Sequence, residues 1–130
     1  MAGFDRAAAV RGFWISIEAR DWDAARSLLA DGCVTEWPHS RERFEGADAY
    51  IEMNRAYPEG WHITVLGVVA DGDTAASEIR VDQDDRVFFA ASFFEFGPQS
   101  KVVRLHELWV SSPYEEPADW RAPWSRPLEI

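Results

Sequence analysis

The sequence predicts a single α+β domain in which helices come first and a long antiparallel sheet follows. The chain has 130 residues, which is enough for one domain of ordinary size. Apolar residues recur at steps of three and four up to residue 57, as in amphipathic helices. After Gly60 they alternate with period two, as in strands. The expected order of elements is therefore α-α-β-α-β-β-β-β.

The first sixty residues carry the helix signals. Asp21 is a good N-cap for a second helix, and Asp31-Gly32 is a typical helix stop. Pro38 ends a short strand because proline cannot donate to a sheet ladder. We expect helices over residues 4–19, 22–30 and 47–57, a short strand over 33–37 and a polar loop over 38–46.

Four long strands follow, rich in Val, Ile, Phe and Trp. Their connectors are three or four residues long and consist of turn-forming residues, so sequential neighbours should pair antiparallel. We expect strands over residues 61–70, 74–82, 86–96 and 101–110.

The last segment, residues 111–130, is rich in proline and carries Tyr114, Trp120 and Trp124. Proline opposes regular structure, whereas exposed tryptophans are unfavourable in a loose tail. We therefore expect residues 1–110 to form the domain, and the tail to pack on that domain or on a partner subunit.

Charge and composition exclude several classes of function. Thirteen basic against 23 acidic residues give a net charge of −10, which repels nucleic acids and anionic membrane surfaces. No apolar run approaches the roughly 20 residues that span a bilayer, and no secretory leader is evident. The single cysteine, Cys33, offers neither an internal disulfide nor a zinc signature. We expect a cytoplasmic protein without a metal or cofactor.

Strand alternation singles out a set of charged residues. Glu78, Arg80 and Asp82 share one parity, and Glu107 shares the parity of large apolar residues on the last strand. If both parities face the same concave side as Ser92, these groups converge in a pocket whose burial raises carboxylate pKa values. The alternative is an ordinary solvated sheet face with weak ion pairs.

The aromatic residues favour a cavity and an association surface. Strand 86–96 is apolar on both parities, so we expect a homodimer through the face that carries Phe89 and Phe93. Other aromatic and aliphatic residues are candidates for a substrate-binding cavity, although each could equally be plain core. These candidates, with Ser92, are Phe13, Trp14, Ile17, Trp37, Met53, Tyr57, Phe94 and Trp109.

Two stretches, RDWDAARSLLADGCVTEWP and FFEFGPQSKVVRLHELW, together with the order of elements, resemble the SnoaL-like branch of the NTF2-like superfamily. The resemblance covers about residues 4–110. It implies a cone in which a bent sheet wraps round the N-terminal helices and a pocket opens inward. Many members form dimers through the outer sheet face. Known members include ketosteroid isomerases, polyketide cyclases, limonene-epoxide hydrolases, dehydratases and non-catalytic binding modules.

The ketosteroid isomerase pattern requires a Tyr and two Asp residues. The corresponding positions here are Phe13, Trp37 and Ser92. Phe and Trp cannot shuttle a proton, and serine is a weaker donor than a neutral carboxylic acid. The sequence therefore argues against steroid isomerase chemistry.

The epoxide hydrolase pattern fits better, because Arg80 and Asp82 stand two residues apart on one strand and Glu107 lies on the last strand. Two carboxylates bridged by an arginine can activate a water and protonate a leaving oxygen. The water-holding Tyr and Asn of that pattern are missing, with Thr35 and Trp37 nearby instead.

The favoured interpretation is a cofactor-free acid/base enzyme, a cyclase, isomerase, dehydratase or epoxide-type hydrolase, that acts on a small apolar molecule. Glu107 is the preferred base, steered by Arg80, while Glu78 is a second possible base. His39 and His62 are further possible proton carriers. The alternatives are a non-catalytic ligand-binding or accessory module of the same fold, and a structural dimer whose pocket is filled.

Overall fold

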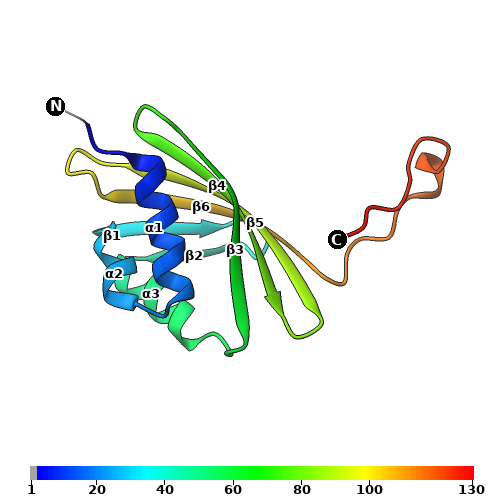
Figure 1. Ribbon diagram of the computed structural model, residues 1–130, viewed down its shortest axis with the longest axis horizontal. Helices are drawn as coiled ribbons and strands as arrows, with labels where there is room; N and C mark the ends of the chain where they lie inside the picture. The colour runs from blue at the N-terminus through cyan, green and yellow to red at the C-terminus, as the bar shows by residue number, and fades with distance from the viewer. Residues whose placement is uncertain (1–2) are drawn as a thin grey trace.

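The computed structural model of the chain describes residues 3–130 and has the expected α+β architecture (Figure 1). Asp5 and Asp21 cap the first two helices by accepting hydrogen bonds from the amides of Ala8 and Ala24. The helices are α1 (Arg6–Glu18), α2 (Trp22–Ser27) and α3 (Ala47–Ala56). The strands are β1 (Leu29–Trp37), β2 (Glu42–Glu45), β3 (Trp61–Asp71), β4 (Thr74–Gln83), β5 (Arg86–Phe96) and β6 (Val102–Ser111), followed by a short 3-10 helix, η1 (Asp119–Arg121).

All six strands form one sheet in the order β2-β1-β6-β5-β4-β3. Strands β3 to β6 pair antiparallel in sequence order, which confirms the predicted meander. Strand β1 lies parallel to β6, so the first strand joins the last one, and the sheet stays open with β2 and β3 at its two edges. In Figure 1 the helices cover one face of the strongly bent sheet, which is the cone-like arrangement expected.

Two local expectations are wrong. The second helix ends at Ser27 and β1 already begins at Leu29, because the chain must pair with Val102 at the start of β6. The stretch predicted as a polar loop contains β2, whose backbone pairs antiparallel with β1 despite its charged side chains. Edge strands tolerate such side chains, and periodicity alone does not reveal them.

The core lies between the helices and the concave face of the sheet. Helix α1 buries Val10, Phe13, Trp14 and Ile17, and its Trp14 indole donates a hydrogen bond to Ser77 on β4 (2.9 Å). No helix among residues 3–130 is long and apolar enough to cross a membrane. Beyond Ser111 the chain leaves the domain as an extended segment.

Candidate functional site

A cavity of about 250 Å³ lies between the helices and the concave sheet face. Its walls are mainly aromatic and aliphatic, with a few polar side chains among them, which is the usual character of a small-molecule site. The lining residues are Trp14, Ile17, Trp37, His39, Met53, Asn54, Tyr57, Trp61, Ile63, Ile79, Val81, Phe88, Trp109 and Ser111.

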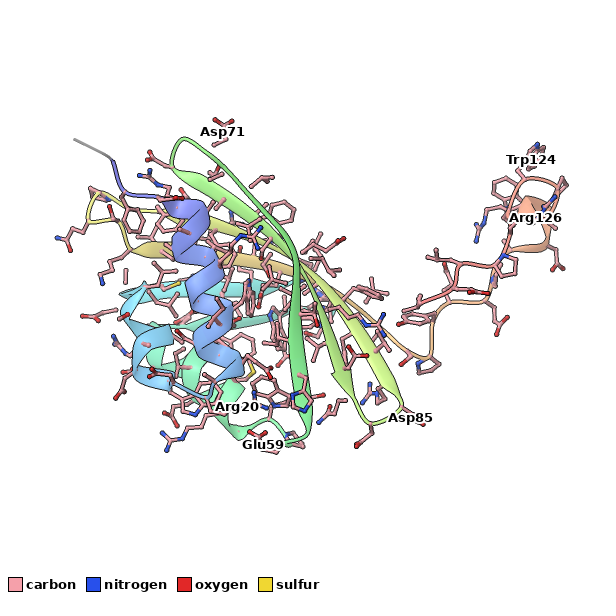
Figure 2. All side chains as sticks on the ribbon, in the orientation of Figure 1. Arg20, Glu59, Asp71, Asp85, Trp124 and Arg126 are labelled. Atoms are coloured by element: carbon pink, nitrogen blue, oxygen red, sulfur yellow. The ribbon has the colours of Figure 1, made fainter. Side chains whose placement is uncertain are left out.

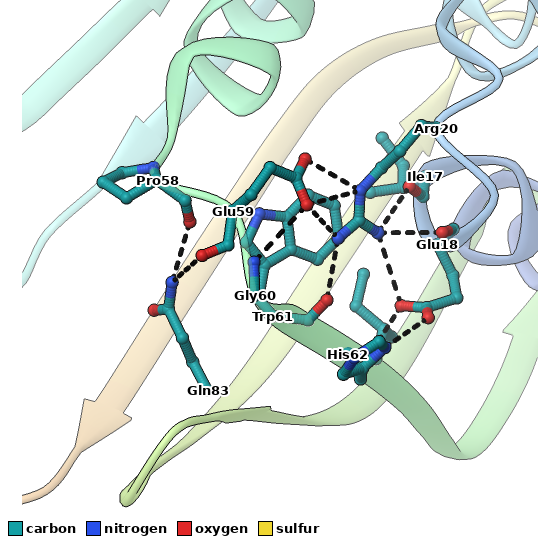
Figure 3. Close-up of polar contacts among 10 residues, drawn as sticks. Ile17, Glu18, Arg20, Pro58, Glu59, Gly60, Trp61, His62 and Gln83 are labelled. Atoms are coloured by element: carbon teal, nitrogen blue, oxygen red, sulfur yellow. Dashed lines mark hydrogen bonds and ion pairs between the residues drawn. The ribbon is translucent and has the colours of Figure 1, made fainter.

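One end of the cavity wall is fixed by a cluster of charged residues around Trp61 (Figure 3). The Arg20 guanidinium lies 3.2 Å from the centroid of the Trp61 ring and donates to the Trp61 carbonyl (2.8 Å). Glu59 accepts hydrogen bonds from the same guanidinium, with Oε1 2.8 Å from Nη2. Cation–π contact and hydrogen bonds together hold this indole in place.

Glu107 is the only fully buried carboxylate among residues 3–130, with a side chain that is 0% exposed. Three neutral donors from three elements surround it. The Tyr50 hydroxyl (2.9 Å) and the Trp37 indole N–H (3.0 Å) donate to Oε1, and the Ser92 hydroxyl donates to Oε2 (2.6 Å). The sheet register places Ser92 directly opposite Glu107, while helix α3 supplies Tyr50.

Within residues 3–130, no Arg, Lys or His side chain forms an ion pair with the Glu107 carboxylate. Only neutral hydrogen-bond donors therefore offset the cost of burying its charge. Burial raises the pKa of Glu107 above its ordinary value of 4.5, and the hydrogen bonds from Ser92, Trp37 and Tyr50 offset only part of that rise. Burial also raises the pKa of Tyr50 well above 10, so its hydroxyl keeps its proton and remains a donor. A raised carboxylate pKa is typical of groups that exchange protons near neutral pH.

The expected convergence of charges on the concave face is wrong for three of the four residues. On β4 the buried parity is Ala75, Ser77, Ile79 and Val81, so Glu78, Arg80 and Asp82 point to the outer face. Arg80 pairs there with Asp82 (2.9 Å) and not with Glu107. Small and aliphatic side chains fit beneath the helices, whereas charged ones would remain unpaired there.

The expected cavity residues divide into two groups. Trp14, Ile17, Trp37, Met53, Tyr57 and Trp109 line the cavity. Phe13 and Phe94 instead pack edge-to-face in the core, and Ser92 is a partner of Glu107 rather than part of the lining.

Sequence reasoning did not identify several members of the site. Trp61, Ile63, Ile79, Val81 and Phe88 all lie on the inward parity of their strands, so strand parity was the signal that could have found them. Asn54 and Ser111 lie on a helix and at a strand end and carried no such signal, whereas His39, predicted as a possible proton carrier, does line the cavity from a turn. Tyr50 stands one helical turn before Met53, yet nothing in the sequence connects it with Glu107.

The arrangement provides an apolar cavity with a buried carboxyl behind its wall, whose pKa burial raises. Glu107 does not itself line the cavity, because the Trp37 indole, which does, is bonded to it. Within residues 3–130, no group of three or more His, Cys, Asp or Glu side chains lies where it could hold a metal ion.

Comparison with known proteins agrees with this architecture. The chain resembles a ketosteroid isomerase candidate from Kribbella flavida DSM 17836, at 27% identity and a TM-score of 0.86 over 96% of this chain and 90% of that one. An NTF-2 like protein of unknown function from Burkholderia xenovorans LB400 matches at 24% identity and a TM-score of 0.76, covering 95% of each chain. An LEH-like epoxide hydrolase of M. tuberculosis shares the fold at 18% identity and a TM-score of 0.68, over 81% of this chain and 82% of that one.

The chain has no significant match among curated proteins. A family profile described as a SnoaL-like domain matches residues 10–105, which include α3, β3 to β5 and most of the cavity lining. With its bent sheet, inward cavity and NTF2-like structural neighbours, this chain belongs to the SnoaL-like domain family.

Proposed function

We propose that this protein binds a small, largely apolar molecule in its aromatic cavity and acts on it by cofactor-free acid/base chemistry. The observation that carries the proposal is the pairing of an aromatic cavity of about 250 Å³ with a buried carboxyl that has neutral partners only. Pockets for drug-sized ligands begin at roughly 300 Å³, so this one suits a molecule of one or two rings.

Two indole groups indicate the polar part of that molecule. Trp61 and Trp109 both line the cavity, and their indole nitrogens are buried without a hydrogen-bond partner among residues 3–130. A buried donor without a partner costs roughly 1–3 kcal/mol. Because both nitrogens are buried, each indole would have to turn its N–H toward the cavity, and a carbonyl or ether oxygen on the ligand would then provide an acceptor. The proposed ligand is therefore an apolar ring compound with one or two such oxygens.

Glu107 is the proposed acid/base group, and Trp37 controls access to it. The Trp37 indole lies between the carboxylate and the cavity, so its rotation would let a ligand atom take its place beside Oε1. In this largely apolar site, Glu107 could then remove a proton next to a ligand carbonyl while an indole N–H stabilises the developing oxyanion. This chemistry is that of an isomerase, a cyclase or a dehydratase.

Epoxide hydrolysis by the arginine-bridged route has less support. That route needs Arg80 and Asp82 beside Glu107, whereas both residues lie on the opposite face of the sheet. The Kribbella flavida relative is described as a ketosteroid isomerase candidate. In this chain, two of the positions that the isomerase pattern gives to acids, Trp37 and Ser92, instead donate hydrogen bonds to Glu107.

The binding part is tested with a matched pair of probes, 2-tetralone and its hydrocarbon counterpart tetralin. Calorimetry or ligand-observed NMR should show that the ketone binds at least fivefold tighter to the wild type. In Trp109→Phe, which keeps a ring but removes the N–H, this preference should shrink. Equal affinity for both probes would show that the indoles do not select an acceptor.

The catalytic part is tested by exchange of the α-protons of 2-tetralone in D₂O, followed by NMR. The wild type should accelerate exchange, and Glu107→Gln should bind the ketone with similar affinity but lose at least 90% of the acceleration, because an amide cannot accept the proton. Arg80→Gln, on the outer face, serves as the control. Undiminished exchange by Glu107→Gln would rule out Glu107 as the base and leave a binding module.

A further inference from the structure

The C-terminal residues 112–130 form an arm that extends away from the domain (Figures 1 and 2). Its root is anchored, because the Ser112 amide and the Tyr114 hydroxyl both donate to the carbonyl of Val87 at the start of β5 (3.1 and 3.0 Å). Past this root, η1 makes no contact with another helix or strand of the described chain. Figure 2 shows Trp124 and Arg126 at the far end of the arm, well separated from the sheet.

The arm carries more exposed apolar surface than a solvated tail should. Trp120 is 71% exposed and Trp124 is 79% exposed, and both Leu128 and Ile130 are exposed as well. The arm is nevertheless locally ordered, since backbone amides of Ala122 and Trp124 donate to the carbonyls of Asp119 and Arg121. A defined turn that presents two tryptophans to water is typical of a surface that docks on something else.

The domain has a complementary uncovered surface on the outer face of its sheet. The large apolar side chains exposed there come from β3, β5 and β6 and are Leu66, Val69, Phe93, Leu108 and Val110. Two of them, Leu108 and Val110, lie on the strand that runs directly into the arm. A second molecule placed on this face would therefore lie beside the point where the arm begins.

The regions aligned with two related structures extend into the arm. Alignments with the Kribbella flavida and Burkholderia xenovorans proteins cover 96% and 95% of this chain. The residues up to the end of β6 are only 111 of 130, which is too few to account for that coverage. The alignments thus continue into residues 112–130. The alignment with the LEH-like hydrolase covers 81% of this chain, which is fewer residues than the domain itself contains.

We propose that two copies of this chain exchange arms, so that the tryptophans of each arm pack on the domain of the other copy. A twofold exchange covers both uncovered surfaces of the chain in one closed assembly. Each tryptophan can bury roughly 150–250 Å². Two arms and the surface they cover, together with the outer sheet faces, reach the roughly 1,200–2,000 Å² of a stable interface.

The first test compares the full-length wild type with the double variant Trp120→Ser/Trp124→Ser by sedimentation equilibrium. Both tryptophans are exposed in the single chain, so the substitutions leave the domain core intact. The wild type should be a dimer at micromolar concentration, and the variant should dissociate with a constant at least tenfold larger, because buried tryptophans dominate interface energies. Glu116→Gln on the same arm is the matched control and should behave as the wild type.

The second test asks which molecule the arm contacts. Cys33 is buried, and burial with the nearby Glu107 raises its pKa to about 11, so a thiol introduced by Ser125→Cys is the reactive one for a photo-crosslinker. Exchange predicts a covalent dimer of twice 14.8 kDa. A monomeric wild type, equal dissociation of wild type and double variant, or crosslinks confined to one chain would each overturn the proposal.

Discussion

Two glutamates on the two faces of the same sheet behave in opposite ways. Glu36 on β1 pairs in register with His106, the residue immediately before Glu107 on β6. Glu36 points outward, where Arg104 Nε donates to it at 2.8 Å, and this hydrogen bond lowers its pKa. Glu107 points inward to three neutral donors, and burial raises its pKa.

The difference shows that the face of the sheet, rather than the residue type or its place in the strand, decides the chemistry of a carboxylate here. A charged group on the outer face is solvated and finds a guanidinium. A carboxyl beneath the helices loses solvation, and neutral hydrogen bonds compensate only partly. On β4, Asp82 pairs with Arg80 as Glu36 pairs with Arg104, and its pKa is lowered as well. Of these three carboxylates, Glu107 alone has a pKa that its surroundings raise.

The largest effect is expected from removing the inner carboxyl. Glu107→Ala leaves a void and deprives Ser92, Trp37 and Tyr50 of their acceptor, which should lower the free energy of unfolding by about 2–5 kcal/mol. Glu36→Ala should lower the midpoint of urea unfolding far less, since its partner Arg104 is solvated. Similar midpoints for the two variants would contradict the comparison.

The next largest effect is expected from removing one of the three hydrogen bonds to Glu107. Tyr50→Phe keeps the ring and removes the hydroxyl that donates to Glu107 Oε1, so the free energy of unfolding should fall by about 1–3 kcal/mol. Loss of this donor should also raise the pKa of Glu107 further, which carboxyl-selective ¹³C NMR measures. Tyr57→Phe, at an exposed tyrosine in the cavity wall, is the control and should leave that pKa unchanged.

The two faces should also differ in the sign of their pH dependence. The pKa of Glu107 is higher in the folded state than its ordinary value of 4.5, so its favourable contribution is present below pH 4.5 and is lost as pH rises through the folded pKa. Glu36 has a lowered pKa, so its contribution is present above pH 4.5 and is lost as pH falls. The difference in the free energy of unfolding between the wild type and each of Glu107→Gln and Glu36→Gln, measured from pH 3 to 8, should change with pH in opposite directions. Changes in the same direction would refute this prediction.

The smallest effect is expected at the outer ion pair of β4. Asp82→Asn removes the charge that faces Arg80 on a solvated surface, so the affinity for 2-tetralone and the rate of α-proton exchange should match the wild type within twofold. A loss of exchange comparable to that of Glu107→Gln would restore the arginine-bridged mechanism and would mean that the outer face takes part in catalysis.

Much of the fold follows from the sequence because it depends on local patterns. Helical spacing located α1 and α3 to within two residues, and period-two alternation with short turns defined the meander of β3 to β6. The inward parity of Glu107 followed from its large apolar neighbours on the same face. These features depend on residues close together along the chain, for which periodicity is a direct signal.

Only the tertiary structure decided which parity of β4 faces the core, because the alternation in the sequence is compatible with either face lying beneath the helices. In the structure the buried face is the one that carries Ala75, Ser77 and Ile79. The tertiary structure also decided that β1 pairs parallel with β6 and that Tyr50, Trp37 and Ser92 meet at Glu107. These contacts join residues 15 to 70 positions apart, and their partners are set by how the sheet bends round the helices. The sequence by itself therefore determined most of the elements, though not β2, and the candidate carboxyl. Packing determined the neighbours of that carboxyl, because burial and long-range pairing are properties of the whole fold.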